Sequence, residues 1–172
     1  MSGGVAVSQL GGPEVLEWVE HDPGDPGPNE VRVRHTAVGL NFIDVYHRTG
    51  LYPQKLPFTP GVEGAGVVEA VGSEVEDLAA GARVAYTSNG PVGSYCEARV
   101  MPRARVVELP DEISEETAAA MMVKGCTVEY LVRRTYAVQP GDNVLLTAAA
   151  GGVGLIACQW LRALGANVIG TV

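Results

Sequence analysis

The stretch Asn143-Val144-Leu145-Leu146-Thr147-Ala148-Ala149-Ala150-Gly151-Gly152-Val153-Gly154 decides the fold class of this chain. It opens with a nearly continuous apolar run over residues 143–148, typical of a strand buried on both faces of a parallel sheet. After the glycines, apolar residues recur at the spacing of one buried helix face, at Val153, Ile156, Ala157, Trp160, Leu161 and Leu164. Gly165 is placed to end that helix, and residues 167–172 have the pattern of a second strand. We therefore expect a strand, a tight loop, a helix and a second strand.

The loop Ala149-Ala150-Gly151-Gly152-Val153-Gly154 has the spacing G-x-G-x-x-G, with alanine in place of the first glycine. A pyrophosphate needs small residues here, because it must approach backbone N–H groups at a helix N-terminus, where the dipole favours negative charge. Gly154 would let the helix pack closely on the strand. The hexapeptide alone also fits a structural turn, and it is the strand before it and the helix and strand after it that favour a dinucleotide site.

The end of the second expected strand bears on the choice of dinucleotide. A domain that prefers NAD usually places Asp or Glu about 20 residues beyond the loop, where it holds the ribose 2′-hydroxyl. The residues at that distance are Ile169-Gly170-Thr171-Val172, none of them acidic, which favours NADP. A doubly wound domain needs further strands and helices, so we expect the chain to be a fragment with about half of that domain.

Residues 1–110 are dense in glycine and proline, with short apolar runs at residues 31–34, 66–71 and 82–86. Short strands between turn signals predict an all-β barrel or sandwich, and no helix is expected in this half.

After Pro110 the pattern becomes helical. Ser114 followed by Glu115 and Glu116 resembles a helix N-terminus, and an alanine- and methionine-rich run follows it over residues 118–122. A second helix is expected over residues 127–136, before the turn signal Pro140-Gly141-Asp142.

Charge and hydropathy exclude some classes of partner. The 172 residues include 20 acidic and 12 basic side chains, a formal charge of -8, with no run of lysine and arginine, which argues against nucleic acid. No secretory signal is visible at the N-terminus, and the most apolar stretch, residues 144–158, is broken by glycines and too short to span a bilayer. We expect a cytoplasmic protein without membrane contact.

The cysteines are three in number and widely spaced, which suits neither a disulfide framework nor a closed metal site. We expect them to be reduced, mostly buried and, without an adjacent base, not nucleophilic. The histidines have no Cys, Asp or Glu partner at ligand spacing and are expected to face solvent. These residues are Cys96, Cys126 and Cys158, and His21, His35 and His47.

Several motifs resemble those of one family. They are Gly11-Gly12-Pro13-Glu14-Val15-Leu16, Gly39-Leu40-Asn41-Phe42-Ile43-Asp44-Val45-Tyr46, Gly50-Leu51-Tyr52-Pro53, Gly61-Val62-Glu63-Gly64-Ala65-Gly66 and residues 148–154. Over the whole chain the sequence resembles the quinone oxidoreductases, the zinc-free, zeta-crystallin-like branch of the medium-chain dehydrogenases/reductases. The resemblance implies a mixed β and α/β fold. A GroES-like, partly open β-barrel forms a catalytic domain over residues 1–123, and the beginning of a Rossmann doubly wound parallel sheet follows over residues 124–172.

The resemblance also bears on metal binding. Zinc-dependent relatives carry a Cys where Asn41 stands and a His where Val62 stands, and neither an amide nor a valine replaces those ligands. The structural zinc lobe, with its closely spaced cysteines, is also absent from residues 86–96. We expect a metal-free enzyme.

The resemblance further implies which residues form the site. Asn41 lies beside the nicotinamide, Tyr46 and Tyr52 line a quinone slot and donate to its oxygens, and Asp44 orients a neighbour or assists protonation. Taken alone, these residues also fit a turn, ordinary packing and a solvated surface carboxylate. The expected catalytic set is Asn41, Asp44, Tyr46 and Tyr52.

Cofactor contacts are implied at Asn41, Phe42 and Tyr46, at Lys124 and Thr127, and in the loop at Ala149, Ala150, Gly151, Gly152 and Val153. For Lys124 an exposed lysine that extends its apolar stem along the surface is the alternative interpretation.

The implied reaction is metal-free hydride transfer from NADPH to a quinone, because such a substrate is already electron-poor and needs mainly orientation from the protein. Two alternatives stay open: reduction of the C=C bond of enones or enoyl thioesters in the same cleft, and a crystallin-like protein that binds the dinucleotide without useful turnover. A homodimer is implied for the complete protein.

Overall fold

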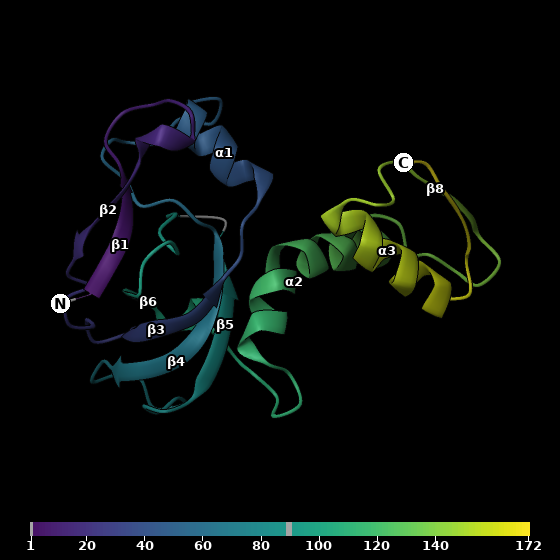
Figure 1. The fold of residues 1–172 in the computed structure, drawn as a ribbon. Coiled ribbons are helices and arrows are strands. Elements are labelled where there is room, and N and C mark those ends of the chain that lie inside the picture. The colour runs from purple at the N-terminus through teal and green to yellow at the C-terminus, as the bar shows by residue number, and fades with distance from the viewer. Residues whose placement is uncertain (1, 89–90) are drawn as a thin grey trace. The chain divides into compact units, whose positions relative to one another are not determined.

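The computed structural model describes residues 2–88 and 91–172. The chain forms two compact units, Met1–Met122 and Val123–Val172, which we call unit 1 and unit 2 and describe separately (Figure 1).

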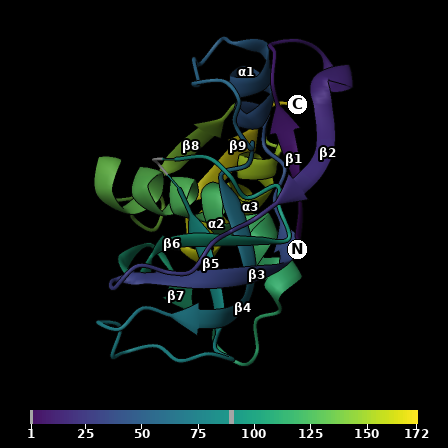
Figure 2. The same cartoon turned by 90° about the vertical axis from the view of Figure 1, so that its left-hand side faces the viewer.

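Unit 1 is built from antiparallel strands. A five-stranded sheet has the order β6-β3-β4-β5-β7, and a separate ribbon pairs β1 with β2 (Figure 2). The edge strands β6 and β7 do not pair with each other, so the barrel is partly open. The strands are β1 (Ser2–Val7), β2 (Leu16–His21), β3 (Glu30–Val38), β4 (Glu63–Val71), β5 (Arg83–Thr87), β6 (Ala98–Pro102) and β7 (Val107–Glu108). The prediction of a β-rich first half with strands near residues 31–34, 66–71 and 82–86 is confirmed.

The core of unit 1 follows from the alternation along the strands. Val31 and Val33 of β3 are fully buried, and they pack with Val68 of β4 and Val84 of β5. Because side chains alternate across a strand, these residues share one face of the sheet, and Ala65 and Ala85 form a second buried cluster with α2 (Glu115–Glu129). Single 3-10 turns, η1 (Pro13–Val15) and η2 (Arg103–Arg105), lie between strands.

The expectation that the first half contains no helix is wrong. Helix α1 spans Phe42–Thr49, and its N-cap is Asn41, whose backbone N–H donates to the Asp44 carboxylate at 2.9 Å. Gly50, with φ of 82°, ends the helix in the left-handed conformation that glycine adopts without strain. The cap and glycine were present in the sequence, but the surrounding Gly- and Pro-rich pattern masked this short helix.

The two helices expected between residues 114 and 136 are one continuous element. Helix α2 runs Glu115–Glu129 and passes directly into a π-helical turn, η3 (Tyr130–Thr135). Ser114 caps it as expected, since its hydroxyl accepts from the Thr117 N–H at 3.2 Å. The start of α2 packs Ala118 and Ala119 within unit 1, whereas Val128 and Val132 lie in the core of unit 2.

Unit 2 contains the predicted strand-loop-helix-strand segment. Strand β8 (Asn143–Leu146) pairs in parallel with β9 (Asn167–Gly170), and α3 (Gly152–Ala163) connects them. The predicted apolar face of α3 packs in the core, led by Ala157 and Leu161, and Gly165 follows the helix with φ of 82°. These predictions are confirmed.

One expectation for unit 2 is wrong, because β8 is not buried on both faces. Val144 and Val168 pack into the unit 2 core, whereas Leu145 and Ile169 point away from it and are 66% and 61% exposed. In this unit the core covers a single face of the β8-β9 pair. Among the described residues, none of the helices is long and apolar enough to cross a membrane.

Candidate functional site: a glycine loop and a carboxylate-amide network

The glycine loop joins the end of β8 to the start of α3. Ala148 has φ of 52°, which turns the chain sharply, and its carbonyl accepts from the Gly151 N–H at 2.9 Å. The Ala149 N–H donates to the Thr171 carbonyl at 2.8 Å, which ties the loop to the residue just after β9. The loop is therefore held by backbone hydrogen bonds and not by side chains.

Gly154 fits the helix against the loop as the sequence predicts. It is buried, and a Cβ at this position would collide with the carbonyl oxygens of Ala148 and Ala149. Gly151 and Gly152 are exposed, so the first turn of α3 is accessible. Backbone N–H groups in a first turn have no intrahelical acceptor and face along the positive end of the helix dipole.

Lys124 lies beside this loop within unit 2. A Cβ built on Gly152 would lie 3.0 Å from the Lys124 Cε, so the lysine stem runs along the glycine backbone. Lys124 is half-buried and not fully extended into solvent, which disfavours the surface-lysine alternative. Thr127, three residues further along α2, donates its hydroxyl to the Val123 carbonyl at 2.7 Å. The Lys124 side chain therefore lies next to the glycine loop, whereas the Thr127 hydroxyl is hydrogen-bonded within α2.

In unit 1, a network of buried and half-buried polar groups surrounds Asn41. Its side-chain Nδ2 donates to Glu63 Oε1 at 2.7 Å, and its backbone N–H donates to Asp44 Oδ2 at 2.9 Å. The Tyr95 hydroxyl donates to the same Asp44 oxygen at 2.9 Å. We call Asn41, Asp44, Glu63 and Tyr95 the carboxylate-amide network.

Asp44 is buried, so the alternative of a solvated surface carboxylate is wrong. Burial raises the pKa of Asp44 above its usual value, while the hydrogen bonds from Asn41 and Tyr95 act in the opposite direction. The pKa of Tyr95 is raised by burial and by the charge of Asp44. Since one Asp44 oxygen accepts from both Asn41 and Tyr95, the geometry favours an orienting role over proton transfer.

Three aromatic side chains lie next to this network on and after α1. The Tyr46 and Tyr52 rings meet edge to face with centroids 5.4 Å apart, and the Phe42 ring lies 6.1 Å from that of Tyr46. Phe42 is 77% exposed and Tyr52 is 50% exposed. We call Phe42, Tyr46 and Tyr52 the aromatic face. Exposed aromatic rings can pack on a planar ring, and the tyrosine hydroxyls can donate hydrogen bonds to its oxygens.

The expectation that the histidines face solvent is wrong for His35 and His47. The Nδ1 of His35 lies 2.6 Å from the Cys96 carbonyl and its Nε2 lies 2.7 Å from the Tyr86 hydroxyl. A carbonyl only accepts, so Nδ1 carries the hydrogen and Nε2 accepts from Tyr86. Burial lowers the pKa of His35 to about 4 and also lowers the pKa of His47, which is buried on α1. The loop-like sequence around these residues hid their long-range partners.

The cysteines are free, as expected, but only Cys96 is buried; Cys158 is half-buried and Cys126 is exposed. Burial raises the pKa of Cys96 to about 11, so its thiol is not an activated nucleophile.

Asn41 and Val62 stand at the positions where zinc-dependent relatives carry their ligands. Val62 is buried, and Asn41 donates to Glu63. Within residues 2–88 and 91–172, no group of three or more His, Cys, Asp or Glu could hold a metal ion. Residues 89 and 90 of the segment 86–96 lie outside the described residues.

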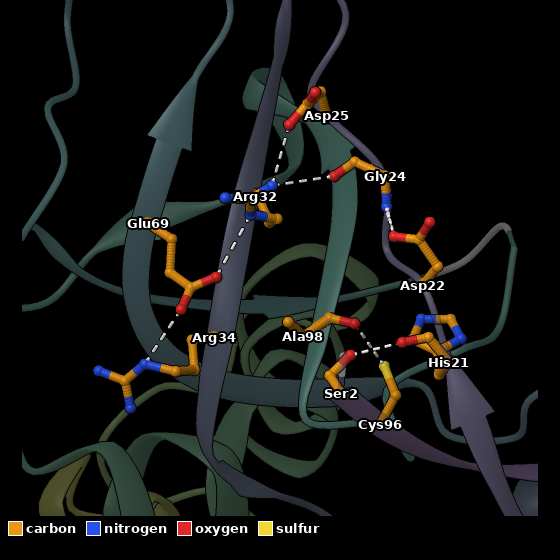
Figure 3. A network of polar contacts seen from close by, with 10 residues as sticks. All are labelled: Ser2, His21, Asp22, Gly24, Asp25, Arg32, Arg34, Glu69, Cys96 and Ala98. Carbon is orange, nitrogen blue, oxygen red and sulfur yellow. Dashed lines mark hydrogen bonds and ion pairs between the residues drawn. The ribbon is translucent and has the colours of Figure 1, made fainter.

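A second polar cluster lies on β3 and β4. Figure 3 shows Glu69 between Arg32 and Arg34, with Arg32 also paired to Asp25. The cluster borders a hollow of about 600 Å³. Because these charges pair with one another, the cluster has the character of a surface ion-pair network and not of a site.

Two members of the carboxylate-amide network were missed from the sequence. The sequence alone could have indicated Glu63, because a carboxylate inside the apolar, glycine-rich stretch 61–66 needs a hydrogen-bond partner when it is buried. No local feature of the sequence indicated Tyr95, since its partner Asp44 is 51 residues away.

Comparison with known proteins supports the fold assignment. Residues 27–111 match the alcohol dehydrogenase GroES-like domain. A quinone oxidoreductase of Pseudomonas aeruginosa is 56% identical over 169 residues, covering 98% of this chain and 52% of the relative. A 2-haloacrylate reductase of Burkholderia is 44% identical over 173 residues, covering 96% of this chain and 51% of the relative.

Solved structures agree with these relatives. The quinone oxidoreductase of Pseudomonas syringae matches with a TM-score of 0.96 at 57% identity, covering 100% of this chain and 53% of that one. The Escherichia coli quinone oxidoreductase, solved in complex with NADPH, matches with a TM-score of 0.95 at 49% identity, covering 99% of this chain and 52% of that one.

The GroES-like β-barrel followed by a parallel β-α-β unit defines a member of the medium-chain dehydrogenases/reductases. Within this class, the chain is similar to quinone oxidoreductases over nearly its whole length. It spans about half the length of the curated relatives that it matches.

Proposed function

We propose that this chain contributes the substrate-facing barrel and the entrance of the dinucleotide site to an NADPH-dependent quinone reductase. The observation that carries the proposal is the loop at the start of α3, with accessible glycines, a Gly154 that admits no side chain and the Lys124 stem beside Gly152. In this proposal residues 1–123 form the catalytic domain and residues 124–172 begin the NADP-binding domain.

The residues of the loop fit a dinucleotide. A pyrophosphate needs close approach to backbone N–H groups, and only small residues, Ala149 to Gly152, line the approach. The Lys124 ammonium adds positive charge near that end of the helix. The preference for NADPH over NADH is supported by the absence of an acidic residue from 169–172, because Asp or Glu there would repel a 2′-phosphate.

When bound, NADPH supplies the hydride, and the protein supplies orientation. The quinone accepts the hydride with its electron pair and takes one proton from water, which gives the hydroquinone and NADP⁺. In the proposal Tyr46 and Tyr52 donate hydrogen bonds to the quinone oxygens, Phe42 packs against a ring, and Asn41 contacts the nicotinamide. Asp44 orients Asn41 and Tyr95 through the hydrogen bonds described above. Ala149, Ala150, Gly151, Gly152 and Val153 hold the pyrophosphate, and Lys124 and Thr127 lie toward the nicotinamide ribose.

A steady-state assay of the complete protein tests the proposal. We expect oxidation of NADPH, with NADH much less effective, in the presence of a panel of benzoquinones and naphthoquinones. A correctly folded protein that oxidises no NADPH above background with any quinone contradicts it. The homodimer and the cytoplasmic location remain predictions.

A second function is favoured by one specific relative. The 2-haloacrylate reductase is named for reduction of an activated C=C bond, and it matches almost the whole of this chain. The same site would then transfer a hydride to the β-carbon and a proton to the α-carbon. The ratio of kcat/KM for a quinone to that for 2-chloroacrylate or an enone decides between the two, since discrimination is a ratio of those constants. Tight NADPH binding with negligible turnover of either substrate would instead support the crystallin-like alternative.

A further inference from the structure

Two of the sequence motifs are joined by hydrogen bonds in unit 1. The first, residues 39–46, supplies Asn41, and the second, residues 61–66, supplies Glu63 at the start of β4. The backbones are joined where the Gly39 N–H donates to the Glu63 carbonyl at 3.3 Å. Asn41 Nδ2 then donates to Glu63 Oε1 at 2.7 Å.

The fold makes room for this carboxylate. Glu63 is 0% exposed, and burying an ionisable group is costly unless hydrogen bonds offset the loss of water. Gly39 has no side chain where a Cβ would collide with Glu63 Oε1 and with the Ala119 carbonyl. The glycine of one motif therefore accommodates the carboxylate of the other, and the carboxylate is aimed at Asn41.

A carboxylate partner selects one orientation of an amide. The two ends of the Asn41 side chain have opposite polarity, because Nδ2 donates and Oδ1 accepts. Glu63 Oε1 accepts from Asn41 Nδ2, so the flipped orientation would place the two oxygens against each other. Asp44 holds the Asn41 backbone at the same time, and Tyr95 holds Asp44. Both the position and the orientation of the Asn41 amide are therefore fixed.

We propose that Glu63 is a positioning residue for the nicotinamide site, which acts by holding the Asn41 amide in one of its two orientations. The inference rests on the proposed function, in which Asn41 contacts the nicotinamide. Glu63 itself is buried behind Asn41 and touches neither the cofactor nor the substrate.

A double-mutant cycle on the complete protein tests this role. The variants are E63A, N41A and the double variant, with NADPH Kd and quinone kcat/KM measured for each. We expect E63A to lower kcat/KM by about 10- to 100-fold, since misplacement of a contacting group by about 1 Å costs that much. In the N41A background, E63A should change kcat/KM by no more than about twofold, because the residue it acts through is already gone.

Three further variants separate positioning from stability. E63Q retains an oxygen that accepts from Asn41 but adds a donor that can pair with the flipped amide, so it should keep the Tm of the parent protein while recovering only part of the lost kcat/KM. N41D places a carboxylate against Glu63, and N41D/E63Q restores a hydrogen bond with the donor on the other side. We expect that double variant to regain the Tm lost in N41D but not kcat/KM, because the Asn41 amide is still missing.

The outcomes distinguish this inference from the proposed function. Additive losses from E63A and N41A, with quinone turnover intact in the parent protein, overturn the inference alone. Turnover absent in the parent overturns the proposed function, and the cycle on NADPH Kd still decides the inference. Absence of NADPH binding overturns both. E69Q is the matched control, because Glu69 lies on the same strand but pairs with Arg32 and Arg34 (Figure 3), and it should leave both constants unchanged.

Discussion

The two candidate sites in this chain are built in different ways. The glycine loop of unit 2 is a contiguous segment held by backbone hydrogen bonds, and its glycines serve by leaving space. The carboxylate-amide network of unit 1 is held by side chains from separate segments, with Asp44 and Glu63 both buried. The loop therefore depends on local geometry, and the network depends on pairing of polar groups at long range. Three substitutions test this difference, in order of decreasing effect.

The largest effect is expected from G154V in the loop. A side chain at this position meets the carbonyl oxygens of Ala148 and Ala149, and backbone cannot move aside as a flexible side chain can. We expect a loss of about 3 kcal/mol in the free energy of unfolding of unit 2, at the upper end for overpacking, together with loss of NADPH binding. Urea denaturation measured by circular dichroism gives the free energy.

The control is A163V, which also introduces valine into α3 but at an exposed position. A163V should lower the free energy of unfolding by less than about 1 kcal/mol, which is the scale of a difference in helix propensity alone. Equal effects of G154V and A163V would mean that Gly154 is not required for close packing.

The next effect concerns pH and is confined to unit 1, since all three histidines lie there. Burial lowers the pKa of His35 from 6.5 to about 4, so the unfolded state binds its proton more readily than the folded state. Stability should therefore fall as the pH drops from 6.5 towards 4. At about 1.4 kcal/mol per pKa unit, the loss from this group approaches about 3 kcal/mol.

Chemical denaturation between pH 4 and pH 7.5 measures this dependence. H35Q has a side chain that does not titrate, so the difference in stability between the two proteins should shrink as the pH falls. Asp44 acts with the opposite sign, because burial raises its pKa and ionisation as the pH rises costs stability. Asp44 is present in both proteins and cancels in the difference. A constant difference across this range would contradict a half-buried His35 that is neutral in the folded state.

The smallest effect is expected from Y95F. The substitution removes only the hydroxyl that donates to Asp44 Oδ2, a hydrogen bond to a charged group worth about 1.5–2 kcal/mol. It should also raise the pKa of Asp44 further, since that hydrogen bond lowers it. Y136F, at an exposed tyrosine of unit 2, is the control and should cost less than about 0.5 kcal/mol. If the two substitutions cost the same, the network contributes no more than a surface contact.

The fold of unit 2 could be predicted because its information is local. The apolar run of β8, the spacing along α3 and the position of Gly165 each reflect structure within a few residues. The failure at Leu145 and Ile169 is instructive, since exposure depends on which layers cover the strand and not on its own sequence.

The carboxylate-amide network could be predicted only in part. Asn41 and Asp44 are close in sequence and carry a cap signal, whereas Tyr95 reaches Asp44 across 51 residues. His35 was assigned to solvent because its partners Tyr86 and Cys96 are equally remote. Buried polar pairs of this kind are set by strand register, which the sequence does not show locally.

The central claim is that the loop at the start of α3 holds the dinucleotide, and calorimetric titration of NADPH into the complete protein and its G152V variant tests it most directly. The three atoms nearest to a Cβ at Gly152 all belong to the flexible Lys124 stem, so the variant should fold, while its methyl groups cover the approach to the loop. We expect the parent protein to bind NADPH and the variant to bind it at least about tenfold more weakly, the loss of about 1.4 kcal/mol. Equal affinity in both proteins, with Tm unchanged, would contradict the claim.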